Sequence, residues 1–217
     1  MDSKIVNLII NCMSKVIVVF TIVCLVSCME VNVKNQSISD SFSIFEEQVF
    51  WDSWIKKHDD STCPLEPLTT ILSKEKLNGI NSKIQKAIKQ SNVFIVSIIV
   101  NIDNGIFDIS CFLQDNNKWK VLKWANLGET FSEKYISSSQ FINDDLLKKV
   151  YNKTIFVDTS ERMIFDADSV YIMLKYNDDI SRFAVYNSEF DEERKKNGGT
   201  SIIFIEKIIS EMENNSH

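Results

Sequence analysis

The sequence is poor in the residues and motifs from which common catalytic sites are built. Its 217 residues include two histidines, and there is no phosphate-binding glycine loop, no HExxH or CxxC motif and no GxSxG turn. Because His217 is the last residue, His58 is the one candidate for a catalytic imidazole. His58 could activate Cys63 as a nucleophile, but the polar segment KKHDDSTC does not fix their geometry. These absences argue against an enzyme.

Carboxylates are the remaining candidates for chemistry. Asp158, Glu161, Asp166 and Asp168 fall within FVDTSERMIFDAD, and two carboxylates can hydrolyse a glycoside or bind a divalent cation. However, acidic residues in turns are usually solvated, and the glycine of a calcium-binding loop is missing. We therefore predict neither a metal site nor a cofactor.

The main apolar run is too short to cross a membrane. Eleven uncharged residues, Val16–Val26, follow Lys15, whereas a bilayer needs about 20. A basic start and about 7 to 15 apolar residues are typical of a secretory signal. The run ends in Leu25-Val26-Ser27-Cys28, which resembles the lipobox of bacterial lipoproteins. The alternatives are a buried hydrophobic segment and an ordinary anchor.

The resemblance implies a lipid-anchored protein of the bacterial cell envelope. In lipoproteins the chain is cut before the acylated cysteine, so residues 1–27 would be a signal peptide, with Met13 as an alternative translation start. Residues 28–40 would form a lipidated tether and residues 41–217 a single domain. Because Met29, and not aspartate, follows Cys28, the lipoprotein pattern implies the outer membrane, facing the periplasm.

Acidic charge dominates the chain that would remain after cleavage. Without the three charged residues of the signal peptide, 22 basic and 29 acidic residues give a net charge of −7. This balance argues against nucleic acid, which needs a basic surface, and favours a basic protein partner. We expect the acidic turn residues Asp178, Asp179 and Glu192 to steer such a partner. The alternative is the ordinary acidity of a soluble domain.

Cys63 and Cys111 are candidates for a disulfide bond in an oxidising envelope. The bond would close a loop of roughly 50 residues and stabilise the domain by about 4 kcal/mol. Alternatively, Cys111 remains a free thiol, because in GIFDISCFLQ it would share a strand face with Phe107, Ile109 and Leu113.

The hydrophobic pattern predicts an α+β domain. Phe42, Phe45 and Val49 recur at helical spacing, and a second helical pattern covers residues 68–89, with Asn78-Gly79 as a candidate interruption. Residues 93–101, VFIVSIIVN, have the continuous apolar character of a central strand. Hairpins are expected at residues 105–124 and 169–187, short strands at 153–158 and 162–166, and helices at 143–151 and 198–214. The predicted fold is an antiparallel sheet built from hairpins, with N-terminal helices and a C-terminal helix packed on it.

Trp119 is a candidate contact for a partner. In KWKVLKW, Leu122 and Trp124 would face one side of a strand and Trp119 the other, where a helix of the protein or a partner must cover it. Large aromatic side chains of this kind dominate the energetics of interfaces.

The whole plan is similar to that of periplasmic lipoprotein immunity proteins. It combines a lipobox at Cys28, one small acidic domain and no catalytic constellation. The resemblance implies a protein that neutralises a toxin or an enzyme by direct binding. The alternatives are a structural or scaffolding envelope lipoprotein and, less favoured, a hydrolase.

Overall fold

The computed structural model describes residues 42–58, 72–101, 105–126, 128–152, 154–159, 168–177, 179–187 and 189–213. All of these residues belong to one compact unit, Phe42–His217. Among the helices in these ranges, none has the length and apolar character that a membrane span requires.

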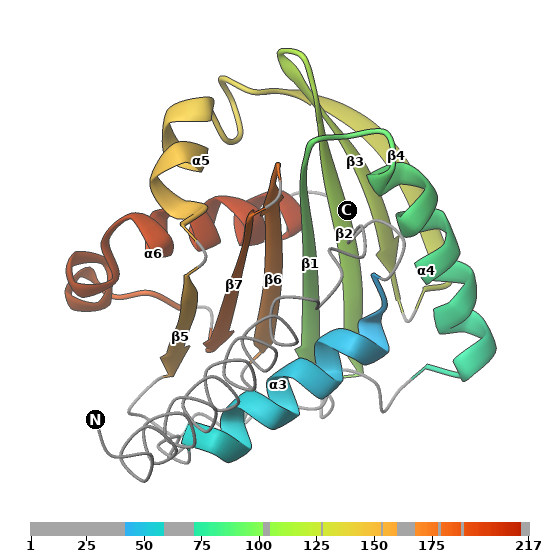
Figure 1. Ribbon diagram of the computed structural model, residues 1–217, viewed down its shortest axis with the longest axis horizontal. Coiled ribbons are helices and arrows are strands. Elements are labelled where there is room, and N and C mark those ends of the chain that lie inside the picture. The colour runs from blue at the N-terminus through green and yellow to red at the C-terminus, as the bar shows by residue number, and fades with distance from the viewer. Residues whose placement is uncertain are drawn as a thin grey trace, which may run out of the picture. The chain divides into compact units, whose positions relative to one another are not determined.

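A seven-stranded sheet with the order β4-β3-β2-β1-β6-β7-β5 organises the domain (Figure 1). All neighbouring strands pair antiparallel except β5 and β7, which pair in parallel. The predicted α+β class with a largely antiparallel sheet is therefore confirmed. The strands are β1 (Val93–Asn101), β2 (Ile106–Asp115), β3 (Lys118–Ala125), β4 (Thr130–Ser137), β5 (Ile155–Thr159), β6 (Ser169–Tyr176) and β7 (Asp179–Tyr186). The helices are α3 (Ile44–His58), α4 (Lys74–Ile88), α5 (Asp144–Val150) and α6 (Glu192–Glu213).

Strand β1 is the central strand that the sequence predicts. All nine of its residues are buried, and it pairs with β2 on one side and β6 on the other. Side chains alternate between the two faces of a strand, so a strand buried along its whole length must be covered on both faces. Its nearly continuous apolar sequence follows from this position.

The two predicted hairpins, β2–β3 and β6–β7, are also confirmed. Asp115 pairs with Lys118, and Tyr176 pairs with Asp179, so each turn has two residues. Each turn begins with an asparagine, Asn116 or Asn177, at a φ of 54°. Asparagine is enriched in this left-handed conformation, which explains why the turns occur at these positions.

Helices α5 and α6 cover one face of the sheet. Leu147 and Val150 of α5 join the apolar side of α6 in a cluster with alternate residues of the strands. Asn143 caps α5 as predicted, because its side-chain oxygen accepts a hydrogen bond from the Leu146 N–H at 2.9 Å. The members of the cluster on α6 are Phe204, Ile205, Ile208, Ile209 and Met212.

Helices α3 and α4 cover the opposite face (Figure 1). Helix α4 begins after the cap residue Ser73 and continues through Gly79, so the candidate interruption does not form. Helix α3 lies where the sequence predicts it, but its buried side is different. The predicted apolar side includes Val49, which is 63% exposed, whereas Ile44, Glu47 and Trp51 are buried.

Helix α6 begins at Glu192, six residues before the start that the sequence predicts at residue 198. It is kinked at Gly199, whose φ of 53° and ψ of −130° are not helical. The part that follows the kink is the predicted C-terminal helix. The preceding turns, from Glu192, were not predicted.

One strand of the sheet was not predicted, and one predicted strand is not tested. Strand β5 confirms the short strand expected at 153–158, but the second short strand, at 162–166, lies outside the described residues. Strand β4 was not predicted. It is the outermost strand on its side of the sheet and is exposed along much of its length.

Candidate functional site

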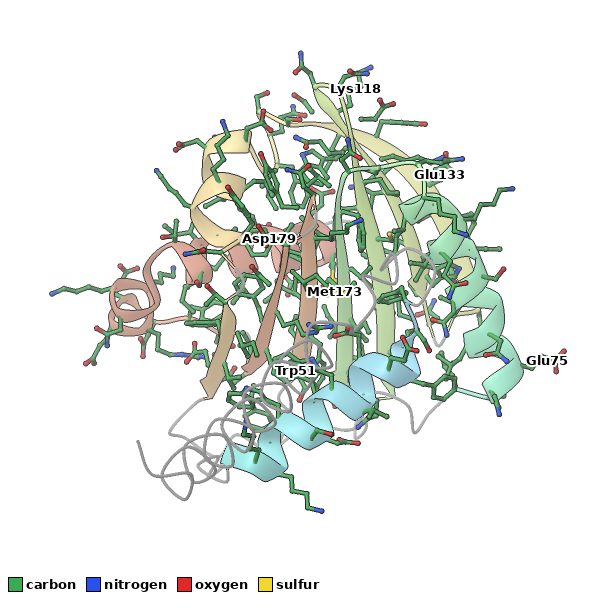
Figure 2. The ribbon with its side chains drawn as sticks, viewed as in Figure 1. Trp51, Glu75, Lys118, Glu133, Met173 and Asp179 are labelled. Carbon is green, nitrogen blue, oxygen red and sulfur yellow. The ribbon has the colours of Figure 1, made fainter. Side chains whose placement is uncertain are left out.

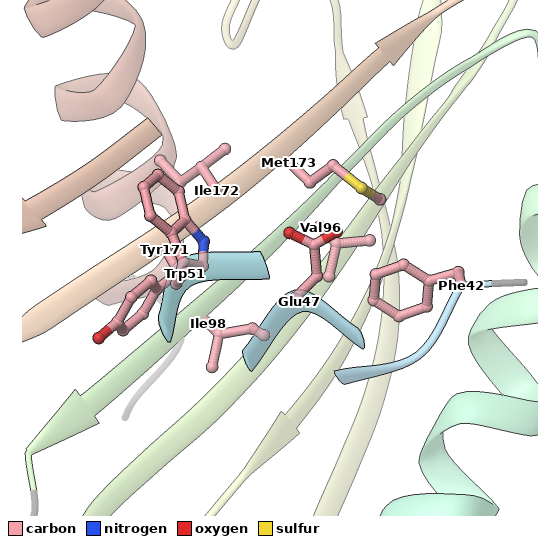
Figure 3. A pocket seen from close by; sticks show the side chains of 8 residues that line it. All are labelled: Phe42, Glu47, Trp51, Val96, Ile98, Tyr171, Ile172 and Met173. Atoms are coloured by element: carbon pink, nitrogen blue, oxygen red, sulfur yellow. The ribbon is translucent and has the colours of Figure 1, made fainter. Parts of the chain in front are cut away.

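A small pocket lies between helix α3 and the central strands (Figure 3). Its enclosed volume is about 10 Å³, room for about one water molecule. Ligand sites for small molecules usually have about 300–1,000 Å³, so this pocket is too small for a typical organic ligand. It is lined by Phe42, Glu47, Trp51, Val96, Ile98, Tyr171, Ile172 and Met173.

The charged group of this pocket already has a partner. Glu47 is 7% exposed, and Arg182 of β7 donates hydrogen bonds to both of its carboxylate oxygens over 3.0 to 3.3 Å. The Arg182 guanidinium also lies 4.1 Å from the centre of the Phe50 ring. A bidentate pair of this kind fixes geometry, so we interpret the pocket as the place where α3 is docked on the sheet.

A second buried polar group lies beneath the end of α6. Lys123 of β3 is 4% exposed, and its Nζ donates to the Met212 carbonyl at 2.5 Å and lies 3.7 Å from Asp108. Its cross-strand neighbour is Ser110, whose hydroxyl is buried with no hydrogen-bond partner among the described residues. A serine beside a lysine could form a nucleophilic pair. Here the lysine instead satisfies a carbonyl at the carboxyl end of a helix, a position that favours a cation.

The described carboxylates do not assemble into a metal site. Asp158 is paired with Arg194 at 2.7 Å, and Asp168 accepts a hydrogen bond from Asn101 at 2.8 Å. Glu161 and Asp166 lie outside the described residues. In the ranges that the structure describes, no group of three metal-binding side chains is close enough to hold an ion.

Of the acidic residues predicted to steer a partner, Asp179 and Glu192 belong to different elements, and their role stays a prediction. Asp179 is the first residue of β7 (Figure 2), and Glu192 is the first residue of α6, six residues beyond the other end of that strand. Eight residues of strand span about 25 Å, so Asp179 is about this far from the end of β7 that leads to Glu192. Glu192 also lies 3.7 Å from Lys195. Asp178 is outside the described residues.

Trp119 is not available to a partner, and this prediction needs correction. Its side chain is fully buried, and its indole N–H donates to the Ile142 carbonyl at 2.9 Å. Phe141 packs edge-on against the ring at 5.5 Å. Trp119 faces the opposite side of β3 from Leu122 and Trp124, as the sequence predicts, and the protein itself covers both sides.

The cysteine predictions have different outcomes. Cys111 is a free, fully buried thiol, and burial raises the pKa of this thiol to about 12. It lies on a face of β2 that is covered by the protein's own core, as the alternative of a packed thiol expects, and the bond to Cys63 stays a prediction because Cys63 lies outside the described residues. Cys63 and Cys28 lie outside the described residues, and His58 is the last residue of α3. Lipidation at Cys28 stays a prediction.

The best candidate for a binding surface is one that the sequence did not reveal. On the outer strand β4, Phe131 is 46% exposed and Tyr135 is 57% exposed. They lie on the same face, four residues apart, with Glu133 between them. Glu133 forms an ion pair with Lys120, whose Nζ lies 2.9 Å from the carboxylate. The hydrogen bond between these two side chains raises the pKa of Lys120. We call these three residues of β4 the edge triad.

Neighbouring residues hold the edge triad in place. Phe131 leans on the buried Trp124 ring at 5.2 Å, and Lys83 of α4 lies 4.6 Å from the centre of the Phe131 ring. The alternation of Phe131, Glu133 and Tyr135 with Ser132 and Lys134 is a weak strand signal in the sequence. That alternation was the one signal that could have located the surface.

Fold and surface together define an α+β domain with helices on both faces of a mixed sheet, whose outer strand β4 has one strand partner among the described residues. No family model matches the chain, and no curated protein or solved structure is significantly similar to it.

Proposed function

We propose that this chain is a lipid-anchored envelope protein that binds another protein and has no catalytic role. In the proposed arrangement, the lipid on Cys28 holds the domain at the outer membrane on the periplasmic side. The domain then neutralises a toxin or an enzyme by direct contact, in the manner of an immunity protein.

The observation that carries the proposal is the edge triad. Exposed aromatic residues at the centre of a surface are typical anchors of protein interfaces, and Phe131 and Tyr135 are two of the exposed large apolar residues of the described chain. Support also comes from the charged groups that could serve catalysis. Glu47 and Lys123 are both bonded within the protein, and the pocket beside Glu47 is too small for a typical substrate.

The test begins with capture of partners by the full-length chain from envelope and secreted proteins. A captured protein is then purified, and its affinity for the chain is measured by calorimetry. Phe131→Ser combined with Tyr135→Ser should weaken binding by a factor of about 30, because loss of interface anchors costs about 2 kcal/mol or more. Val49→Ser is the matched control, since Val49 is 63% exposed on the distant helix α3.

Two further measurements separate the alternatives. An immunity protein should abolish the activity of its partner when the two are mixed in equal amounts, whereas a scaffold should leave that activity unchanged. Turnover of glycan or ester substrates by the full-length chain would contradict the proposal.

A further inference from the structure

The outer side of strand β4 has no strand partner among the described residues, because β4 is last in the strand order. Its register with β3 is continuous from Thr130 to Ser137, and it has no proline. Proteins usually protect an edge with prolines, bulges or charged side chains. Strand β4 has two charged side chains, and both are engaged by ion pairs within the protein, Glu133 with Lys120 and Lys134 with Glu211.

The two faces of β4 are unequal. On the side of α6, Lys134 reaches Glu211 and Ile136 packs against the core, so the protein itself occupies that face. On the other side, the edge triad presents two aromatic rings with a carboxylate between them. Figure 2 shows Glu133 on this outer part of the sheet, away from Asp179. An added strand would therefore find apolar, acidic and apolar neighbours at alternate positions.

A second copy of the chain is a poor occupant of this edge in the register that pairs its exposed aromatic rings. When two copies of one strand pair antiparallel about a twofold axis, the numbers of the two residues in each pair add up to the same value along the strand. The register that stacks Phe131 on Tyr135 of the other copy places Glu133 opposite its own equivalent. Like charges directly opposite each other destabilise a sheet. A different chain with a basic residue opposite Glu133 would instead continue the row of alternating charges that runs from Lys120 on β3 to Glu133 on β4.

We propose that β4 binds an extended segment of the partner protein as an eighth strand, and that this segment has the pattern apolar-x-basic-x-apolar. The apolar side chains lie beside Phe131 and Tyr135, and the basic one faces Glu133. The main chain of the segment supplies the hydrogen bonds, as in other cases of strand addition to a sheet edge. This inference rests on the proposed function and specifies its partner, and the net charge of −6 also favours a basic one.

The test uses a synthetic peptide, Thr-Val-Thr-Arg-Thr-Val-Thr, with a fluorescent label. Its anisotropy is measured against the full-length chain. The matched peptide has glutamate in place of arginine, and a third peptide is N-methylated at alternate residues. We expect the arginine peptide to bind about 2- to 5-fold more tightly than the glutamate peptide, the range for one cross-strand charge pair. N-methylation should reduce binding more than about 10-fold, because it removes main-chain donors.

A charge reversal in the protein gives the decisive comparison. Glu133→Lys should reverse the preference, so that the glutamate peptide binds more tightly. Glu129→Lys makes the same change just outside β4, where Glu129 is exposed and 3.8 Å from Lys76, and should leave the preference as it is. Thermal unfolding followed by circular dichroism verifies that both variants are folded.

Several results would overturn the inference. These are no binding of any peptide at about 1 mM, equal binding of the N-methylated peptide, an unchanged preference in Glu133→Lys, or a dimer of the chain that is lost with Phe131→Ser. The proposed function is tested separately. If a captured protein binds with an affinity that changes in β4 do not affect, the binding function remains and only the edge is rejected as its site. Turnover of substrates by the chain would reject the binding function itself.

Discussion

At the residue scale, two glycines of different conformation give opposite expectations for the same substitution. Gly199 has a φ of 53° and a ψ of −130° at the kink of α6, a conformation that a residue with a Cβ adopts only at a cost. Gly199→Ala should therefore lower the free energy of unfolding by about 1–3 kcal/mol. Gly79 lies within α4, and a Cβ there would meet no atom within 4 Å. Gly79→Ala should therefore raise the free energy of unfolding by about 0.5–1 kcal/mol. Urea unfolding measures both, and a stabilising Gly199→Ala would contradict the kink.

The buried thiol of Cys111 should make stability depend on alkaline pH. Burial raises its pKa from 9.0 to about 12 in the folded chain. The folded state therefore keeps a proton that the unfolded state loses above pH 9, so this contribution is complete below pH 9 and is lost as the pH rises towards 12. The loss is at most about 1.4 kcal/mol per pH unit. Cys111→Ala should show a shallower decline between these pH values in chemical unfolding. Equal slopes for the two proteins would reject the effect.

The same thiol also decides the disulfide question. If Cys111 is free, as in the structure, it should resist a thiol reagent at pH 8 in the folded chain and react after denaturation without a reductant. Cys111→Ala is the control, because the denatured variant should lose one reactive thiol. If the denatured, unreduced variant instead showed one reactive thiol more than the wild type, because the substitution releases Cys63, the predicted bond to Cys63 would be supported.

Residue roles set by local rules could be predicted, and roles set by distant partners could not. The Asn143 cap depends on hydrogen bonds three residues away, and the faces of Leu122 and Trp119 follow from strand alternation. Burial of Glu47 depends on Arg182, which is 135 residues away. No pattern within α3 marks that glutamate as an inward residue, because a charge there normally indicates the solvent side.

At the scale of elements, the ion pair between Glu47 and Arg182 joins α3 to β7. Their side chains are 10% and 21% exposed, so removing one leaves the other poorly solvated. Glu47→Ala or Arg182→Ala should each destabilise the domain by about 3 kcal/mol. The double variant should lose less than the sum of the two, by roughly 0.5–3 kcal/mol. Glu46→Ala, on the exposed side of α3, should change stability by less than about 0.5 kcal/mol. Strict additivity of the two changes would show that the pair does not couple the elements.

The elements that the sequence predicted are those with a strong period or a clear turn. Strand β1 is apolar throughout, and the hairpins β2–β3 and β6–β7 turn at asparagines. Strand β4 has two aromatic residues and an isoleucine among polar ones, because only one of its sides meets the core. The parallel pairing of β5 with β7 depends on a chain crossing that local sequence does not encode. The candidate binding surface lies on β4, so it was missed together with its strand.

At the scale of the whole molecule, acidic and basic side chains of the described residues are interspersed. Asp179 begins β7 and Glu192 begins α6, and Lys83 of α4 lies beside Phe131 of the edge triad. A net charge of −6 can still raise the rate at which a basic partner arrives. The specific contacts must then come from a local surface, and the edge triad provides one with its own carboxylate.

Attachment to the membrane should depend on Cys28 alone among the three cysteines of the first 28 residues. In the proposed lipoprotein, acyl chains on Cys28 anchor the domain, and stable anchoring requires more than one chain. Cys28→Ser should therefore abolish incorporation of labelled palmitate and leave the chain uncut. Cys24→Ser is the matched control, because Cys24 lies four residues upstream in the same apolar run and outside Leu25-Val26-Ser27-Cys28. It should be labelled, cut and fractionated with membranes like the wild type. Labelling of Cys28→Ser at the wild-type level would contradict the assignment of Cys28 as the lipidated residue. Binding measured with the purified chain does not depend on this result, so the tether and the binding surface are tested independently.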